Sequence, residues 1–295
     1  MTFKWAALKN ATIGAYNDIQ RNHTLAIAAG LSYYFMLSLF PFLIFLAAAL
    51  AYIPIPDLFN QTLDLMARFI PPDAMGVVRE ILKGVMNPPR NGLLSFGVLA
   101  TLWAATGGFS AMIEALNVAY DVDETRPFWK TRSLAFGLAF VVGGLMLLGL
   151  ATTLLGPRFG AFLADHHTVG PIFAMVWPYI RWGIIVVTIL FSVELLYFWA
   201  PNVKQGFICT LPGAIIGVAG WIASSWALGI YISEYAHYNK TYGTLGGAIG
   251  LMLWFYVSAA AILVGAEINS EILKAAGKRL PMREPAPPTE LPTAA

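Results

Sequence analysis

Six long apolar stretches dominate this sequence, and they constrain its fold more than any other feature. A helix needs about 20 apolar residues to cross the roughly 30 Å hydrocarbon core of a bilayer. Within lipid every backbone N–H and C=O group needs a partner inside the chain, so stretches of this length form helices. All six lack lysine and arginine in their interiors, and they cover residues 31–53, 93–113, 134–155, 182–199, 207–232 and 245–266. The sequence therefore predicts an all-α, polytopic membrane protein with six transmembrane helices.

The composition agrees with this class. Hydrophobic residues make up 58% of the chain and charged residues 12%, whereas a soluble domain carries about 25% charged residues. The net charge of +2 and the dispersed basic residues give no nucleic-acid surface. We expect one membrane domain over 31–275, an N-terminal segment 1–30 before it, and a proline-rich, disordered cytoplasmic tail 276–295 after it.

The distribution of lysine and arginine predicts the orientation. With both termini inside, eleven basic residues fall on the cytoplasmic side and seven on the outer side. Four of the seven lie in the single long outer loop 54–92. Because short cytoplasmic segments carry the excess of basic residues, the N-in/C-in topology is favoured.

Two segments outside the spans have amphipathic patterns. Residues 5–27 predict an amphipathic helix along the cytoplasmic face. The outer loop 54–92 predicts two short amphipathic helices, each ended by a pair of prolines. These two helices either cap the bundle or form a surface for lipid or a protein partner, with candidate residues Leu58, Met66, Phe69, Ile70, Val78, Ile81 and Leu82.

Polar residues at membrane depth indicate a candidate functional site. Glu194 lies inside the fourth span, and Glu114 and Glu267 lie at the cytoplasmic ends of the second and sixth. A charge in a span costs several kcal/mol unless it faces a polar interior. The three acids either line an inward-facing cavity or a proton path, or each accepts hydrogen bonds from its neighbours. The remaining members of the candidate site are Asn117, Tyr120, Asn202 and Asn269.

No motif for catalysis or energy coupling is present in the sequence. Gly277-Lys278 is followed by Arg279, so the chain has no phosphate-binding loop of the ATPase type. His166, His167 and His237 lack the spacing of a metal motif. We therefore predict no metal, no cofactor and a non-enzymatic function.

Small residues mark helix faces that approach closely. Glycines at a spacing of four let two helix backbones touch and pack by van der Waals contact. The candidate packing residues are Gly213, Gly217 and Gly220 in the fifth span, and Gly243, Gly246, Gly247 and Gly250 at the start of the sixth.

Several segments together resemble the YihY/BrkB family of bacterial inner-membrane proteins, which has long carried the label ribonuclease BN. The resembling segments are AAGLSYY at 28–34, ALNVAYDV at 115–122, RPFW at 126–129, LPGA at 211–214, YNKTYGTLG at 238–246 and GAEIN at 265–269. The resemblance implies a six-helix inner-membrane fold and a role in envelope integrity, with movement of envelope lipids as the expected activity. The ribonuclease label does not suit this chain, because no carboxylate or histidine cluster supports phosphodiester cleavage.

Three functional hypotheses follow. The first is a non-enzymatic component of lipid transport in the inner membrane, which delivers lipid to a periplasm-spanning protein partner through the outer helices. The second is a proton- or cation-coupled transporter of small solutes that uses Glu194. The third is a membrane scaffold or assembly factor, which tolerates changes at the acids but not at the glycine faces. A homo-oligomer is compatible with all three.

Overall fold

The computed structural model describes residues 5–51, 91–166, 170–234 and 244–275, with isolated residues between 60 and 79. The described elements are helices, and none of the described residues forms a strand. They are α1 (Trp5–Arg21), α2 (Thr24–Ala51), α5 (Asn91–Ala119), α6 (Phe128–His166), α7 (Gly170–Trp199), α8 (Phe207–Glu234) and α10 (Thr244–Ala275). Six of them, α2 to α10, are long and apolar enough to cross a membrane. The predicted all-α fold with six spanning helices is confirmed.

The predicted helix at 5–27 is wrong at its end. α1 stops at Arg21, and α2 begins at Thr24. Between them His23 takes a left-handed backbone conformation with φ of 51°, which interrupts the helix. The amphipathic pattern runs through this position without a glycine or proline, so it carried no signal for the break.

Four spanning helices are markedly longer than predicted. α6 runs from Phe128 and α7 from Gly170, although Arg132 and Arg181 had limited the predicted spans. α5 continues to Ala119, and α10 continues to Ala275, nine residues past the predicted end at 266. The extra turns of α10 carry polar residues whose partners come from other helices, so these turns are stable where an isolated apolar run would end.

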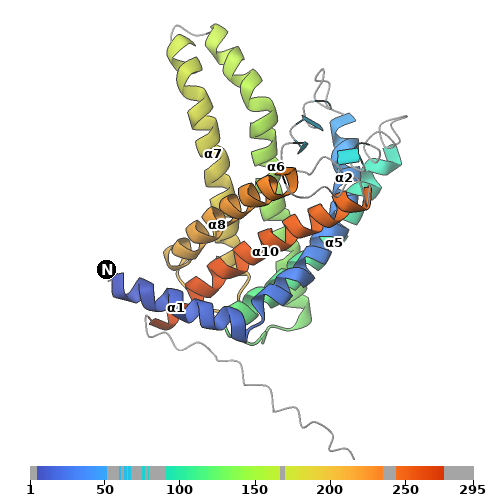
Figure 1. The fold of residues 1–295 in the computed structure, drawn as a ribbon. Helices are drawn as coiled ribbons and strands as arrows, with labels where there is room; N and C mark the ends of the chain where they lie inside the picture. The colour runs from blue at the N-terminus through green and yellow to red at the C-terminus, as the bar shows by residue number, and fades with distance from the viewer. Residues whose placement is uncertain are drawn as a thin grey trace, which may run out of the picture.

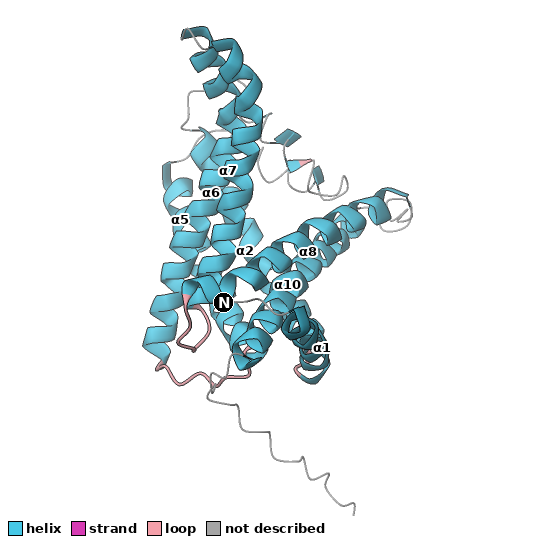
Figure 2. Cartoon of the chain, turned by 90° about the vertical axis from the view of Figure 1, so that its left-hand side faces the viewer, coloured by secondary structure: helices cyan, strands magenta, loops and turns pink. Residues whose placement is uncertain are grey.

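The helices share one end and separate toward the other. Figure 1 shows α5 ending, α6 beginning, α7 ending and α8 beginning in the same region, where α1 also crosses α10. We call this region the polar end. Figures 1 and 2 both show the α8–α10 pair inclined away from the α6–α7 hairpin, whose tip stands clear of the other helices.

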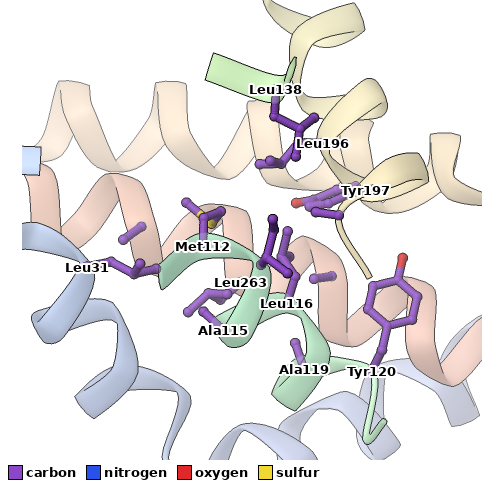
Figure 3. Close-up of a cluster of buried hydrophobic side chains, with 14 of the residues drawn as sticks. Leu31, Met112, Ala115, Leu116, Ala119, Tyr120, Leu138, Leu196, Tyr197 and Leu263 are labelled. Carbon is purple, nitrogen blue, oxygen red and sulfur yellow. The ribbon is translucent and has the colours of Figure 1, made fainter. Parts of the chain in front are cut away.

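The apolar core lies next to the polar end. Buried side chains from α2, α5, α6, α7 and α10 meet there, and Figure 3 shows Leu31, Leu116, Leu138, Leu196 and Leu263 among them. Each of these five leucines is at most 5% exposed. Toward the other end α7 and α8 carry many exposed apolar side chains, as expected where lipid replaces protein as the packing partner.

A close crossing of α8 and α10 uses two of the predicted glycines. Gly213 and Gly217 of α8 face Gly265 of α10, and a Cβ atom on Gly265 would meet the Gly213 carbonyl oxygen. Gly220 does not take part: it is exposed, and no described atom lies within 4 Å of where its Cβ would be. The predicted packing role of Gly220 is therefore wrong, because the close approach at Gly213 and Gly217 does not extend to this residue.

The other predicted packing glycines lie in or near the first turns of α10. Gly250 is buried, Gly243 lies outside the described residues, and the surroundings of Gly246 and Gly247 are not described either. Most of the predicted lipid or partner surface also lies outside the described residues, namely Leu58, Phe69, Ile70, Val78, Ile81 and Leu82. Met66 is described: it is partly buried in the same apolar cluster as Phe42 and Leu150.

Candidate functional site

Buried polar side chains concentrate at the polar end, and Glu194 of α7 is one of the acids enclosed there. Only 1% of Glu194 is exposed. Its Oε1 accepts a hydrogen bond from the Thr210 hydroxyl in the first turn of α8. Its Oε2 is buried without a hydrogen-bond partner among the described residues. Glu194 therefore joins α7 to α8 and keeps one free acceptor.

Asn269 of α10 connects to the same turn of α8. Its Nδ2 donates to the Thr210 carbonyl oxygen at 2.8 Å, and its Oδ1 accepts from the Gly213 backbone N–H at 2.8 Å. The missing Cβ of Gly213 gives the amide room to reach the backbone, because a Cβ there would meet the Asn269 side chain. The hydrogen bond from the Gly213 backbone to Asn269 therefore requires the close approach of α8 and α10 at this glycine.

Two buried tyrosines flank this turn. Tyr197 and Tyr120 are 0% exposed, and Figure 3 shows them at the ends of α7 and α5. The Tyr197 hydroxyl donates to the Ile262 carbonyl of α10. The Tyr120 hydroxyl has no hydrogen bond within the described residues, although Gln205 and Asn269 lie beside it, and burial raises the pKa of Tyr120.

Glu267 ties α10 to the junction of α1 and α2. Its Oε1 accepts from the Thr24 hydroxyl at 2.8 Å and from Asn22 Nδ2 at 3.3 Å. Its Oε2 is buried and lacks a described partner, like that of Glu194. Thr24 is the first residue of α2, so the helix break at His23 places this hydroxyl against the acid.

Lys274 in the last turn of α10 binds three carboxylates. Its ammonium lies 2.7 Å from Asp18 of α1, 2.7 Å from Asp121 after α5 and 2.7 Å from Glu271 of its own helix. Arg21 pairs with Asp121 at 2.6 Å and with Asp18 at 2.9 Å. Burial alone would raise the pKa of Asp121, but Lys274 and Arg21 outweigh it and hold that pKa below its ordinary value.

The two loops of the polar end are fastened to each other. Asn117 of α5 donates from Nδ2 to Glu124 at 2.9 Å, and its Oδ1 accepts from the Asn202 backbone N–H at 2.7 Å. Arg126 pairs with Glu124 at 2.6 Å and donates to the Ala200 carbonyl at 2.7 Å. Residues 120–127 and 200–206 therefore form one hydrogen-bonded layer below the spans.

Acid is expected to weaken this layer. Burial alone would raise the pKa of Glu124. The hydrogen bonds from Arg126 and the Asn117 amide, together with the charge of Arg126, outweigh burial and hold the pKa of Glu124 below 4.5. A lowered pKa contributes stability that is present above 4.5 and is lost as the pH falls through the folded-state value. We expect the melting temperature of Glu124→Gln in detergent to lie below wild type at pH 7, with the gap closing toward pH 3. A gap that stays constant with pH would contradict this assignment.

The structure gathers most of the predicted site residues at this end. Besides Glu194, Glu267 and Asn269, it places Asn117, Tyr120 and Asn202 there. Glu114 is separate: it is exposed, on a face of α5 away from the buried acids. Several contributors to this end were not predicted from the sequence, among them Asp18, Thr24, Tyr197, Thr210 and Lys274. Lys274 was assigned to the region beyond the last span, and hydroxyl residues in apolar runs carry no signal of a distant partner.

This fold and site define a multi-pass α-helical membrane protein with a buried polar network at one end of the bundle. The family model described as "Virulence factor BrkB" matches residues 15–289. The chain belongs to this family, which confirms the resemblance found in the sequence.

Proteins similar in sequence to this chain include both membrane and ribonuclease-like proteins. The chain is 38% identical to the ribonuclease-like protein YfkH of Bacillus subtilis (strain 168), over 88% of this chain and 92% of YfkH. It is 24% identical to a UPF0761 membrane protein of Stenotrophomonas maltophilia (strain R551-3), over 83% of this chain and 56% of that protein. A UPF0761 membrane protein of Alkalilimnicola ehrlichii is 27% identical, over 86% of this chain and 56% of its own length. The chain thus spans little more than half of the latter two proteins, and no solved structure matches it.

Proposed function

We propose that this protein handles membrane lipid in a bacterial inner membrane, with both termini in the cytoplasm, as a non-enzymatic component of phospholipid or envelope-lipid transport. This activity would maintain the integrity of the envelope. The polar end is then the cytoplasmic end. The single observation that carries the proposal is the separation of α7 from α8 beyond the polar end.

Side-chain contacts define where the two helices part. Near the polar end Phe207 of α8 packs on Phe191 and Phe198 of α7, with ring centroids 6.2 and 5.5 Å apart. Helical spacing continues the same stripe of α7 outward to Val187 and Ile184, which are 63% and 39% exposed. Ile222 continues the facing stripe of α8 and is 49% exposed. Both facing stripes are therefore apolar and open, so acyl chains can enter between the helices.

The partners of the acids favour this function over ribonuclease chemistry, which the name of YfkH suggests for that relative. Asp18, Asp121 and Glu124 are paired with basic residues, and Glu194 and Glu267 accept from hydroxyl groups. Within the described residues no group of three or more histidine, cysteine, aspartate or glutamate side chains is placed to hold a metal ion. A protein partner that spans the periplasm would take over the lipid on the outer side.

Lipid movement in vesicles tests the proposal. Purified protein is reconstituted into vesicles that contain a fluorescent phospholipid. The protein is expected to speed the exchange of this lipid between the two leaflets, which is measured by dithionite quenching of the outer leaflet. Val187→Asn places a polar amide on the open stripe and should slow exchange. Val186→Asn is the matched control, because Val186 is 46% exposed but lies about 100° around α7 from Val187. Exchange no faster than in protein-free vesicles would refute the proposal, and equal loss in both variants would refute the assigned path.

One observation favours a second function, a proton- or cation-coupled transporter of small solutes. The Oε2 atoms of Glu194 and Glu267 are buried without a described hydrogen-bond partner, as a carboxylate that takes up a proton or cation would be. Glu194→Gln separates the two functions in the same vesicles. Under the lipid function the variant still exchanges phospholipid, whereas under the transporter function it loses ion-coupled uptake.

A further inference from the structure

An arginine lies at membrane depth on the lipid-facing side of the α5–α6 contact. The guanidinium carbon of Arg132 lies 5.6 Å from the ring centroid of Trp103, and 77% of Trp103 is exposed. Arg132 Nη1 donates to Ser110 Oγ at 3.3 Å, and that hydroxyl is itself fixed by donating to the Thr106 carbonyl at 2.9 Å. Two residues of α5 therefore hold the charged head of this α6 side chain.

The side chain is held away from the membrane surface. Ser110 lies nine residues before Ala119, the last residue of α5, which is roughly 14 Å along the helix axis. Arginine near the end of a spanning helix ordinarily extends its charge toward the headgroups. Arg132 instead reaches along α5 toward Trp103, where its charge needs a negative partner.

The described part of the protein does not supply that partner. No described carboxylate lies within ion-pair distance of Arg132, whereas Arg21, Arg126 and Lys274 are all paired. Glu114 lies one turn beyond Ser110 on α5, and it makes no ion pair with Arg132. A guanidinium carries five N–H donors, and Ser110 accepts from only one. The remaining donors have no hydrogen-bond acceptor among the described residues.

We propose that Arg132, Ser110 and Trp103 bind the phosphodiester headgroup of a membrane phospholipid. A guanidinium binds phosphate oxygens through two parallel hydrogen bonds, which match the donors left free here. The acyl chains would lie along Phe136 and Phe140, which follow Arg132 at helical spacing and are 50% and 70% exposed. The inference rests on the proposed lipid-handling function and assigns it a substrate class, with anionic phosphatidylglycerol favoured because it carries no competing cation.

Native mass spectrometry of the full-length protein with added phosphatidylglycerol tests the site. Arg132→Gln is expected to weaken the tightest binding event about tenfold or more, the equivalent of one charge-assisted hydrogen bond. Lys130→Gln is the matched control, since Lys130 is exposed two residues earlier and its side chain contacts no described acid. Ser110→Ala keeps the charge and removes its anchor, so it should also weaken binding and serves if Arg132→Gln does not fold.

The outcomes separate the alternatives. Unchanged binding in Arg132→Gln, or equal weakening in Lys130→Gln, would overturn the site in favour of general attraction between charges. Displacement of the lipid by millimolar glycerol phosphate would overturn the lipid assignment in favour of a soluble phosphate. Binding that depends on Arg132 supports the site even if the wild-type protein fails to exchange lipid in vesicles, in which case only the proposed function is refuted.

Discussion

Gly265→Ala is expected to destabilise the protein by about 3 kcal/mol, the upper part of the range for an overpacked core. A methyl group there would meet the Gly213 carbonyl, the Tyr197 hydroxyl and, at 3.1 Å, the Gly217 Cα. Two of these three obstacles are backbone atoms of α8, so a rotamer change cannot relieve them. The whole α8–α10 crossing would have to widen, which would also pull Asn269 from the first turns of α8. Thermal unfolding in detergent measures the loss.

Gly220→Ala is the matched control on α8. Its added methyl group meets no described atom within 4 Å, and alanine is favoured over glycine inside a helix by about 0.5–1 kcal/mol. The control should therefore be as stable as wild type or slightly more stable. If Gly265→Ala has the same melting temperature as Gly220→Ala, the two helices do not cross at these glycines.

Lys274→Met is expected to cost about 2–3 kcal/mol, somewhat less than the loss of one partner from a fully buried ion pair. The substitution keeps the apolar stem and removes the charge shared by Asp18, Asp121 and Glu271. Arg21 alone would remain to balance three carboxylates, and its side chain is 61% exposed. Repulsion should then release α1 from α10, which makes α1 more accessible to limited proteolysis and lowers the melting temperature.

Lys204→Met supplies the comparison for this charge. Lys204 is an exposed lysine of the same end of the bundle, and no described acid pairs with it. Its replacement removes one positive charge without breaking an ion pair, so stability should change by less than about 0.5 kcal/mol. If α1 resists limited proteolysis equally well in wild type and in Lys274→Met, Lys274 does not hold that helix against α10.

The spans were predictable because lipid leaves the backbone few alternatives. Their ends were less predictable, because a search for apolar runs stops at the first charge while a helix continues wherever that charge has a partner. α10 passes Glu267, Glu271 and Lys274 without interruption, since α1, α2 and the segment after α5 supply the partners. Those partners lie 153 to 256 residues away in sequence, and no local pattern encodes them.

The acids of the candidate site were predictable for a related reason, because charge in an apolar stretch is rare. Sequence could not separate Glu267, which is buried against Thr24, from Glu114, which is exposed. Both follow an apolar run, and only the rotation of each helix against its neighbours decides which acid faces inward. The position of Arg132 beside Trp103 could not be predicted either, because it depends on the packing of α5 against α6.

α8 and α10 are joined beyond the polar end as well, so they can tilt together as one unit. Trp221 of α8 donates to Ser258, and Trp254 of α10 donates to Ser225. The first turns of α8 are fixed to α7 by Glu194 and by the aromatic contacts of Phe207. α8 has 28 residues and is therefore about 42 Å long at 1.5 Å per residue, so a tilt of about 5° at the polar end displaces its outer end by roughly 3.7 Å. A small change in hydrogen bonding at the polar end is thus magnified into a larger movement at the outer end of the helix.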